Sequence, residues 1–306
     1  MKHVTSRFDA RDSQDLEAGL EAARAALAEN RCIVMPTDTV YGIAADAFSA
    51  QAVATLLAAK GRGRNMPPPV LIPQAATMDG LAVDVPGFAR ELAAEFWPGA
   101  LTLILHAQPS LTWDLGETRG TVALRVPDDE VARQLLRSTG PLAVSSANRT
   151  GNPAAATAEE AFEQLGESVE VYLEAGPRPI SGDALSSTII DCTLTPPRVV
   201  REGALSLEAL RVVIPGLLDS DGQPDPETEA SDAEAAGTDA DADQRDATQA
   251  AQPAEDDAVT SADTYPDADA DADASAPAGP EVTPGETANP GATQGGDVAG
   301  ESARTP

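Results

Sequence analysis

Residues 32–42 read Cys-Ile-Val-Met-Pro-Thr-Asp-Thr-Val-Tyr-Gly, and this stretch gives the first indication of the fold. Residues 32–35 are apolar and stop at Pro36, as in a short buried strand. Two hydroxyls and a carboxylate follow at the strand exit, where α/β proteins usually place ligand contacts. The alternative is an ordinary polar turn with a buried Tyr41.

Apolar periodicity on both sides of this stretch predicts further helices and strands. We expect helices over 13–30, 50–59, 86–96, 129–137, 157–165 and 206–213. Strands are expected over 32–35, 70–72, 101–106, 121–126, 142–145, 169–173, 187–191 and 198–200. Ser13 is expected to cap the first helix. Because several strands follow one another without a helix between them, the fold class predicted is α/β, an open twisted mixed sheet with helices packed on it.

Charge divides the chain into two parts. The formal net charge is -30, with 50 acidic and 20 basic residues, and 23 of the acidic residues but only two arginines lie in 219–306. That segment is rich in Ala, Asp, Pro and Gly and cannot bury enough apolar surface to offset the entropy cost of ordering its backbone. We therefore expect one folded domain over 1–218 and a disordered acidic tail over 219–306.

Features of membrane, secreted and zinc proteins are missing from the sequence. No apolar run is long enough to span a bilayer, and the first residues lack the apolar centre of a signal peptide. Cys32 and Cys192 lie in apolar segments and are expected to pack rather than pair. With two cysteines and two distant histidines, no zinc site is expected, and His106 is interpreted as structural. These features favour a cytoplasmic protein.

A glycine-spaced basic segment, Lys60-Gly61-Arg62-Gly63-Arg64, is the first candidate for phosphate binding. Glycine lets the backbone approach a phosphate closely, and the cations neutralise it. The segment does not match a Walker A loop. Its alternative reading is a solvated basic loop, but Lys60 is one of only two lysines in a chain that otherwise uses arginine. That choice suggests that its compact ammonium group matters.

Two other motifs place polar groups at strand ends. Residues 145–151, Ser-Ser-Ala-Asn-Arg-Thr-Gly, suit phosphate or ribose contacts, or alternatively a helix cap. Residues 186–191 with 201–204 form another such set. Arg125 sits in an apolar strand and needs an anionic partner, either a substrate carboxylate or a structural aspartate. Neither a Ser-His-Asp set nor paired carboxylates stand out, which favours a site that positions ligands and stabilises charge.

In this order the motifs resemble the YrdC/TsaC family of threonylcarbamoyl-adenylate synthases. The matching segments are PTDTVYGIAADA, AAKGRGR, FWPGALTLIL, TVALRVP, SSANRTGNPA, SSTIID and VVREGA, and the resemblance spans about residues 13–211. It implies an α/β fold with a positively charged cavity. It also implies the conversion of L-threonine, bicarbonate and ATP to threonylcarbamoyl-AMP and pyrophosphate, for modification of the tRNA adenosine next to the anticodon.

The resemblance also implies roles for individual residues. ATP would contact Lys60, Arg62, Thr121, Ser146, Asn148 and Arg201, with Lys60 and Arg62 catalytic. Threonine would contact Thr39, Arg125 and Ser187. No protein-bound metal is expected, and Mg²⁺ would arrive with ATP. Separate tRNA-threonylcarbamoyl transferase proteins would use the product, so direct tRNA binding would be weak or absent.

The chain departs from the family pattern at four places. Residues 66–71 replace a stretch that often contains Asn and His, Ala154 and Ser186 replace a usual Ser and Glu, and Glu202 replaces a Pro. The long family form carries an extra domain for which the acidic tail lacks the composition. Two alternatives are kept: an RNA-binding module without ATP turnover, and a hydrogenase-maturation domain, whose Cys-rich zinc fingers are missing here.

Overall fold

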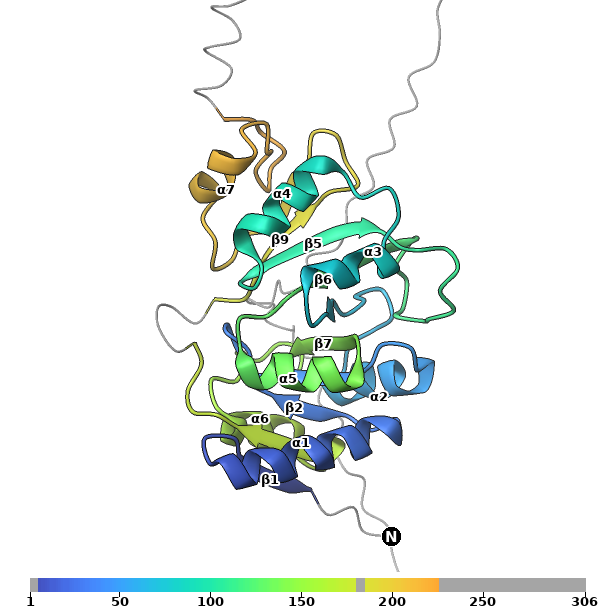
Figure 1. The fold of residues 1–306 in the computed structure, drawn as a ribbon, viewed down its shortest axis with the longest axis vertical. Helices are drawn as coiled ribbons and strands as arrows, with labels where there is room; N and C mark the ends of the chain where they lie inside the picture. The colour runs from blue at the N-terminus through green and yellow to red at the C-terminus, as the bar shows by residue number, and fades with distance from the viewer. Residues whose placement is uncertain (1–4, 180–184, 226–306) are drawn as a thin grey trace, which may run out of the picture. The chain divides into compact units, whose positions relative to one another are not determined.

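The computed structural model describes residues 5–179 and 185–225, and within them it confirms the predicted mixed α/β fold. One sheet runs in the order β1-β8-β2-β3-β7-β4-β6-β5-β9-β10. Figure 1 shows β1, β2, β7, β6 and β5 following one another in this order from bottom to top. Its strands are β1 (Ser6–Asp9), β2 (Ile33–Met35), β3 (Gly42–Asp46), β4 (Val70–Leu71), β5 (Leu101–His106), β6 (Thr121–Arg125), β7 (Leu142–Ser146), β8 (Val171–Glu174), β9 (Thr188–Asp191) and β10 (Arg198–Arg201).

Seven α-helices and two 3₁₀ turns accompany the sheet in the described residues. They are α1 (Ser13–Ala28), α2 (Ala50–Lys60), η1 (Ala75–Thr77), α3 (Met78–Leu81), α4 (Gly87–Phe96), α5 (Glu130–Thr139), α6 (Ala158–Leu165), η2 (Gly166–Ser168) and α7 (Leu207–Val213). None of these helices has the length and apolar character needed to cross a membrane.

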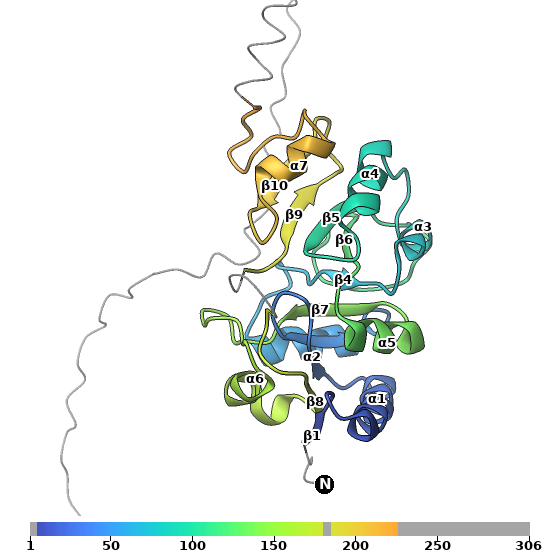
Figure 2. The same ribbon diagram turned by 60° about the vertical axis from the view of Figure 1, so that its left-hand side comes forward.

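The half of the sheet that contains β2, β3 and β7 is covered on both faces. Successive side chains of a strand point to opposite faces. Ile33 and Met35 therefore join one core cluster with α1 and α5, whereas Val34 joins the other core cluster with α2 and α6. Figure 2 shows α1 and α5 on the opposite side of these strands from α6.

The half formed by β4, β6, β5, β9 and β10 is covered differently. Leu101, Leu103 and Leu105 of β5 pack into a core to which α3, α4 and α7 also contribute. Thr102 lies between them in sequence and so points to the opposite face. Among the residues that the structure describes, no helix adds apolar side chains to that opposite face of β5, β6, β9 or β10. It is there that a cavity can form.

Several expectations about local structure were wrong or incomplete. The short strands β1 and β3, and the η1–α3 segment, were not predicted. Asp12, and not Ser13, caps α1, because its side chain accepts from the amides of Gln14 and Asp15. Cys32 and Cys192 are both buried and unpaired, as expected, and burial raises the pKa of Cys32 to about 12.

A short segment after α7 packs along β10, the last strand of the sheet. The Val199 amide donates to the Leu218 carbonyl at 3.0 Å. Arg211 donates to the carbonyls of Leu217 and Gln223, at 3.0 and 3.2 Å. Described contacts thus run past Leu218, the boundary predicted for the folded domain. The rest of the predicted tail lies outside the described residues, so its disorder stays a prediction.

Candidate active site

A cavity that is partly open to solvent lies on the face of the sheet that has no helix over β5 and β6; its empty space is about 550 Å³ when the open solvent at its mouth is included. Arg62, Arg125 and Arg201 all line it. The other polar residues of the lining are threonines and serines from the β2–β3 loop, β5, β7 and the segment just before β9, together with Tyr41, whose hydroxyl is directed away to the Gly176 carbonyl. Within the described part of the chain, no aspartate or glutamate lines this cavity. Such a lining suits anionic ligands.

The strand register explains why these side chains converge. Leu71 pairs with Arg125, and Thr102 pairs with Ile189, so the side chains of each pair share a face. Arg201 also lies opposite Ile189, because an irregularity between Val199 and Arg201 adds one residue to β10. Without that bulge, Arg201 would point to the same face as Val199, into the core.

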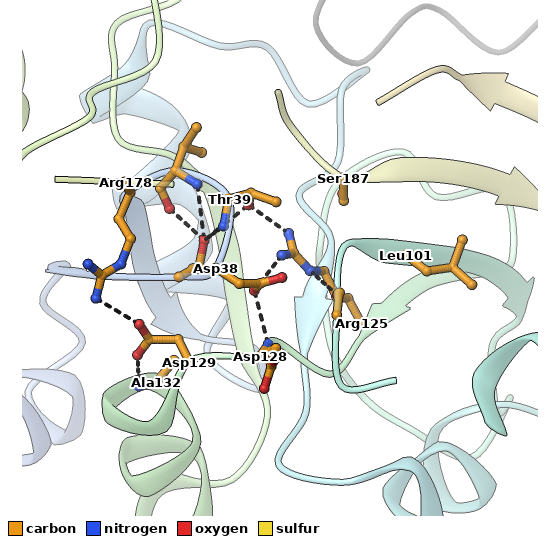
Figure 3. Close-up of polar contacts among 12 residues, drawn as sticks. Asp38, Thr39, Leu101, Arg125, Asp128, Asp129, Ala132, Arg178 and Ser187 are labelled. Carbon is orange, nitrogen blue, oxygen red and sulfur yellow. Dashed lines mark hydrogen bonds and ion pairs between the residues drawn. The ribbon is translucent and has the colours of Figure 1, made fainter. Parts of the chain in front are cut away.

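Two walls of the cavity carry most of its predicted site residues. The α2–β7 wall consists of Arg62, Ser145 and Ser146, and Lys60 is buried behind it at the end of α2. The β6–β10 wall consists of Thr102, Arg125, Ser187 and Arg201. Thr39, from the β2–β3 loop, lies beside Arg125 (Figure 3).

Arg125 is fixed by protein groups on several sides (Figure 3). Its Nε donates to the Gly99 carbonyl at 3.0 Å, and its Nη1 donates to Thr39 Oγ1 at 3.1 Å. Its Nη2 donates to Asp38 Oδ1 at 2.7 Å, in an ion pair whose side chains are 7% and 16% exposed. Burial lowers the pKa of Arg125, and the Asp38 charge opposes that effect. The structural aspartate considered as its partner is therefore present, although Arg125 still lines the cavity.

Ser187 and Arg201 form a second fixed group on the same wall. Arg201 Nη2 donates to the Ser187 carbonyl at 2.7 Å, and Ser187 Oγ lies 2.8 Å from Thr102 Oγ1. Gly203 packs directly against this segment: a Cβ there would lie 2.3 Å from the Ser186 carbonyl oxygen. Only glycine leaves room for that approach.

Lys60 does not lie in a solvated loop, which was the alternative reading of the basic segment. It ends α2, its residue is 1% exposed, and it does not line the cavity. Its Nζ donates to the carbonyls of Ser146 and Asn148, at 2.5 and 2.9 Å, and to Asn148 Oδ1 at 3.2 Å. The Thr150 amide donates back to the Lys60 carbonyl. Lys60 therefore organises the loop after β7 from behind the cavity wall.

Six of the nine predicted site residues line the cavity, namely Thr39, Arg62, Arg125, Ser146, Ser187 and Arg201. Lys60 and Asn148 lie behind the α2–β7 wall. Thr121 lies at the start of β6, at the opposite end of the strand from Arg125. The Thr121 hydroxyl donates to the Thr118 carbonyl.

Sequence interpretation missed Thr102 of the lining, whereas Thr37 and Ser145 lie in motifs that were singled out for ligand contacts without a role of their own. Alternation with the leucines of β5 could have revealed Thr102. Residues 66–71, which depart from the family pattern, give the cavity apolar surface through Pro69 and Leu71. Across residues 5–179 and 185–225, no group of three or more His, Cys, Asp or Glu side chains is placed to hold a metal ion.

Comparison with known proteins gives concordant matches. A family model for Sua5, YciO and YrdC, described as telomere recombination, matches residues 25–203. A Mycobacterium tuberculosis protein provisionally named a threonylcarbamoyl-AMP synthase is 50% identical over 211 residues, which are 69% of this chain and 96% of that protein. The threonylcarbamoyl-AMP synthase of Bacillus subtilis is 35% identical over 69% of this chain and 59% of its own length. The crystal structure of P. abyssi Sua5 complexed with L-threonine superimposes with a TM-score of 0.62 and 31% identity, over 69% of this chain and 61% of that one.

Proposed function

This chain belongs to the Sua5/YciO/YrdC family, and we propose that its arginine-lined cavity is where it makes threonylcarbamoyl-AMP. The chain is an enzyme of the nucleotidyltransferase type, a threonylcarbamoyl-AMP synthase. The observation that carries the assignment of the cavity is its lining: three arginines and many hydroxyls, with no carboxylate among the described residues. L-threonine, bicarbonate and ATP all present anionic groups to such a surface.

ATP is assigned to the α2–β7 wall. Lys60 donates to oxygens without charge on Ser146 and Asn148, and these contacts would place its ammonium group beside the triphosphate. Arg62 and Ser146 reach the cavity directly. Arg201, from the opposite wall, would complete the phosphate contacts. Asn148 would act indirectly, through the loop after β7 that Lys60 holds. Thr121 lies at the opposite end of β6 from Arg125.

Threonine is assigned to Thr39, Arg125 and Ser187. An arginine can hold a carboxylate through two parallel hydrogen bonds, and Arg125 has donors beyond those that bind Gly99, Thr39 and Asp38. The threonine amine would take up the bicarbonate carbon with loss of water. An oxygen of the resulting carbamate then attacks the α-phosphorus of ATP, and the bond from that phosphorus to the pyrophosphate oxygen breaks.

Catalysis in this arrangement comes from position and charge. Negative charge grows on the phosphate oxygens as pyrophosphate leaves, and fixed cations stabilise it. Because the lining has no carboxylate in the described residues, Mg²⁺ would be held by the phosphates and water and would arrive with the nucleotide. The wall that surrounds threonine would keep water from the unstable carbamate.

The product would serve the threonylcarbamoyl modification of tRNA next to the anticodon. Separate transferase proteins would carry out that transfer, in the cytoplasm. The RNA-binding alternative loses support because Lys60 is buried, which leaves fewer exposed cations in the basic segment for a phosphate backbone. Weak tRNA binding that changes little with salt is expected; tight and steeply salt-dependent binding without adenylate formation would favour the alternative.

The direct test is product identification. Incubation with ATP, L-threonine and ¹³C-bicarbonate should give an adenylate that mass spectrometry shows to carry the label, together with pyrophosphate. Omitting threonine or bicarbonate is the matched control and should abolish both products. Hydrolysis of ATP without a labelled adenylate would overturn the proposed function.

A further inference from the structure

A second buried ion pair lies close to Arg125 but does not line the cavity. Asp129 and Arg178 approach to 2.9 Å, with side chains only 4% and 6% exposed (Figure 3). Arg178 Nε is also buried and has no hydrogen-bond partner within the described residues. Removing charges from water is costly, so a buried pair that is not fully satisfied is a poor source of stability. A positional role accounts better for it.

The pair is joined to Arg125 through two consecutive residues. Asp38 Oδ1 accepts from Arg125 Nη2 at 2.7 Å and also from the Asp128 amide at 3.0 Å. The next residue, Asp129, uses Oδ1 to cap α5 at the Ala132 amide and Oδ2 to bind Arg178. Asp129 thus fixes the backbone that presents the Asp128 amide to Asp38.

The Arg178 end is anchored independently of the cavity. Its Nη1 donates to the Ala175 carbonyl at 2.9 Å, and its backbone amide donates to the Ala156 carbonyl at 2.7 Å. Tyr41 OH holds the same turn through the Gly176 carbonyl at 2.7 Å. Burial raises the pKa of Tyr41, so its hydroxyl keeps the proton that it donates. Arg178 therefore offers Asp129 a fixed counter-charge.

We propose that Asp129 and Arg178 are a positioning pair for Arg125. Their ion pair holds the Asp128 amide against Asp38, and Asp38 sets the direction in which Arg125 presents its free donors to the threonine carboxylate. This inference rests on the proposed function, because it takes Arg125 to be the group that reads threonine. Neither member of the pair lines the cavity, and no member of the α2–β7 wall takes part in these contacts.

The test compares Asp129→Asn with Glu130→Gln. Asparagine keeps the shape and the capping oxygen of Asp129 but loses the charge. Glu130 is the next residue and pairs with the exposed Arg137 at 2.8 Å, so its variant is a matched control. Threonine binding is measured by calorimetry and the ATP requirement by pyrophosphate release. We expect Asp129→Asn to weaken threonine binding about 10- to 100-fold, as a misplacement of about 1 Å can do, with the ATP requirement unchanged. Glu130→Gln should change neither.

A double variant, Asp129→Asn with Arg178→Met, separates positioning from stability. It removes both buried charges and should recover the melting temperature that Asp129→Asn loses. If the pair positions Arg125, threonine binding stays weak in the double variant. Threonine binding restored together with stability would overturn the inference, as would equal losses for threonine and ATP. Wild-type protein that binds threonine but makes no adenylate would refute the proposed function alone; wild-type protein that binds no threonine would refute both.

Discussion

The α2–β7 wall and the β6–β10 wall both bring positive charge to one cavity, but they hold it by different partners. On the first, Lys60 is buried against neutral oxygens of Ser146 and Asn148. On the second, Arg125 is buried against the carboxylate of Asp38. A carboxylate cancels a charge and fixes its direction, whereas a carbonyl fixes a charge without cancelling it. We therefore assign the highly charged triphosphate to the side of Lys60, with Arg201 added from the second wall, and the single carboxylate of threonine to Arg125.

The largest effect is expected when Lys60, which supports the α2–β7 wall, is replaced. Lys60→Met leaves buried carbonyls without their donor, so we expect stability to fall by about 2–3 kcal/mol and the melting temperature by roughly 5–10 °C. Adenylate formation should fall about 100- to 1000-fold. Lys60→Arg should rescue only in part, because the larger planar head cannot occupy the same point. Pyrophosphate release and calorimetry provide the measurements.

Arg62→Met is the matched comparison, two residues further along. Arg62 lines the cavity, so its loss should lower turnover about 100-fold while the melting temperature stays within roughly 2 °C. Equal thermal shifts in Arg62→Met and Lys60→Met would show that burial of Lys60 does not organise the wall. Near-normal turnover in Lys60→Met would place the phosphate site elsewhere.

The second wall is tested by Arg125→Ala. The hydrogen bonds of an arginine to a carboxylate are charge-assisted, so the threonine requirement should rise about 10- to 100-fold while the ATP requirement changes less than about threefold. Steady-state kinetics with each substrate varied in turn measures both. A change confined to ATP would reverse the assignment of the two walls.

A smaller effect is expected when the backbone next to Ser187 is displaced by a substitution at Gly203. Gly203→Ala would place a methyl group 2.3 Å from the Ser186 carbonyl oxygen, so the segment that carries Ser187 must move. We expect about a tenfold loss of turnover, carried mostly by the threonine requirement. Gly216→Ala, at a glycine whose added Cβ meets nothing within 4 Å, serves as the control. Wild-type kinetics in Gly203→Ala would show that the β6–β10 wall adjusts to strain.

The smallest effect distinguishes the two ends considered for the folded domain. Truncation after residue 225 should change neither turnover nor melting temperature. Truncation after Leu218 removes the contacts of Arg211 with Gln223 and Asp225, and should lower the melting temperature by about 2–4 °C without a loss of turnover. A tenfold fall in turnover in either protein would show that the segment beyond Leu218 supports catalysis.

Sequence periodicity predicted most helices and strands because their apolar side chains are large and regularly spaced. It missed β3, Gly-Ile-Ala-Ala-Asp, because small side chains give a weak strand signal, although this strand sits in the middle of the sheet. The position of Lys60 could not be predicted locally, since its acceptors lie 86 and 88 residues further along the chain. Arg125 was correctly interpreted as needing an anion, but the sequence alone did not choose Asp38.

The bulge in β10 has a consequence for how this enzyme can vary. The one extra residue between Val199 and Arg201 decides which face of the sheet Arg201 points to. A strand with alternating faces tolerates many exchanges of side chain but not a change in the number of residues. Natural variation in this segment should therefore be rich in substitutions and poor in single-residue insertions or deletions. In this segment the number of residues therefore matters more for activity than the identity of each residue.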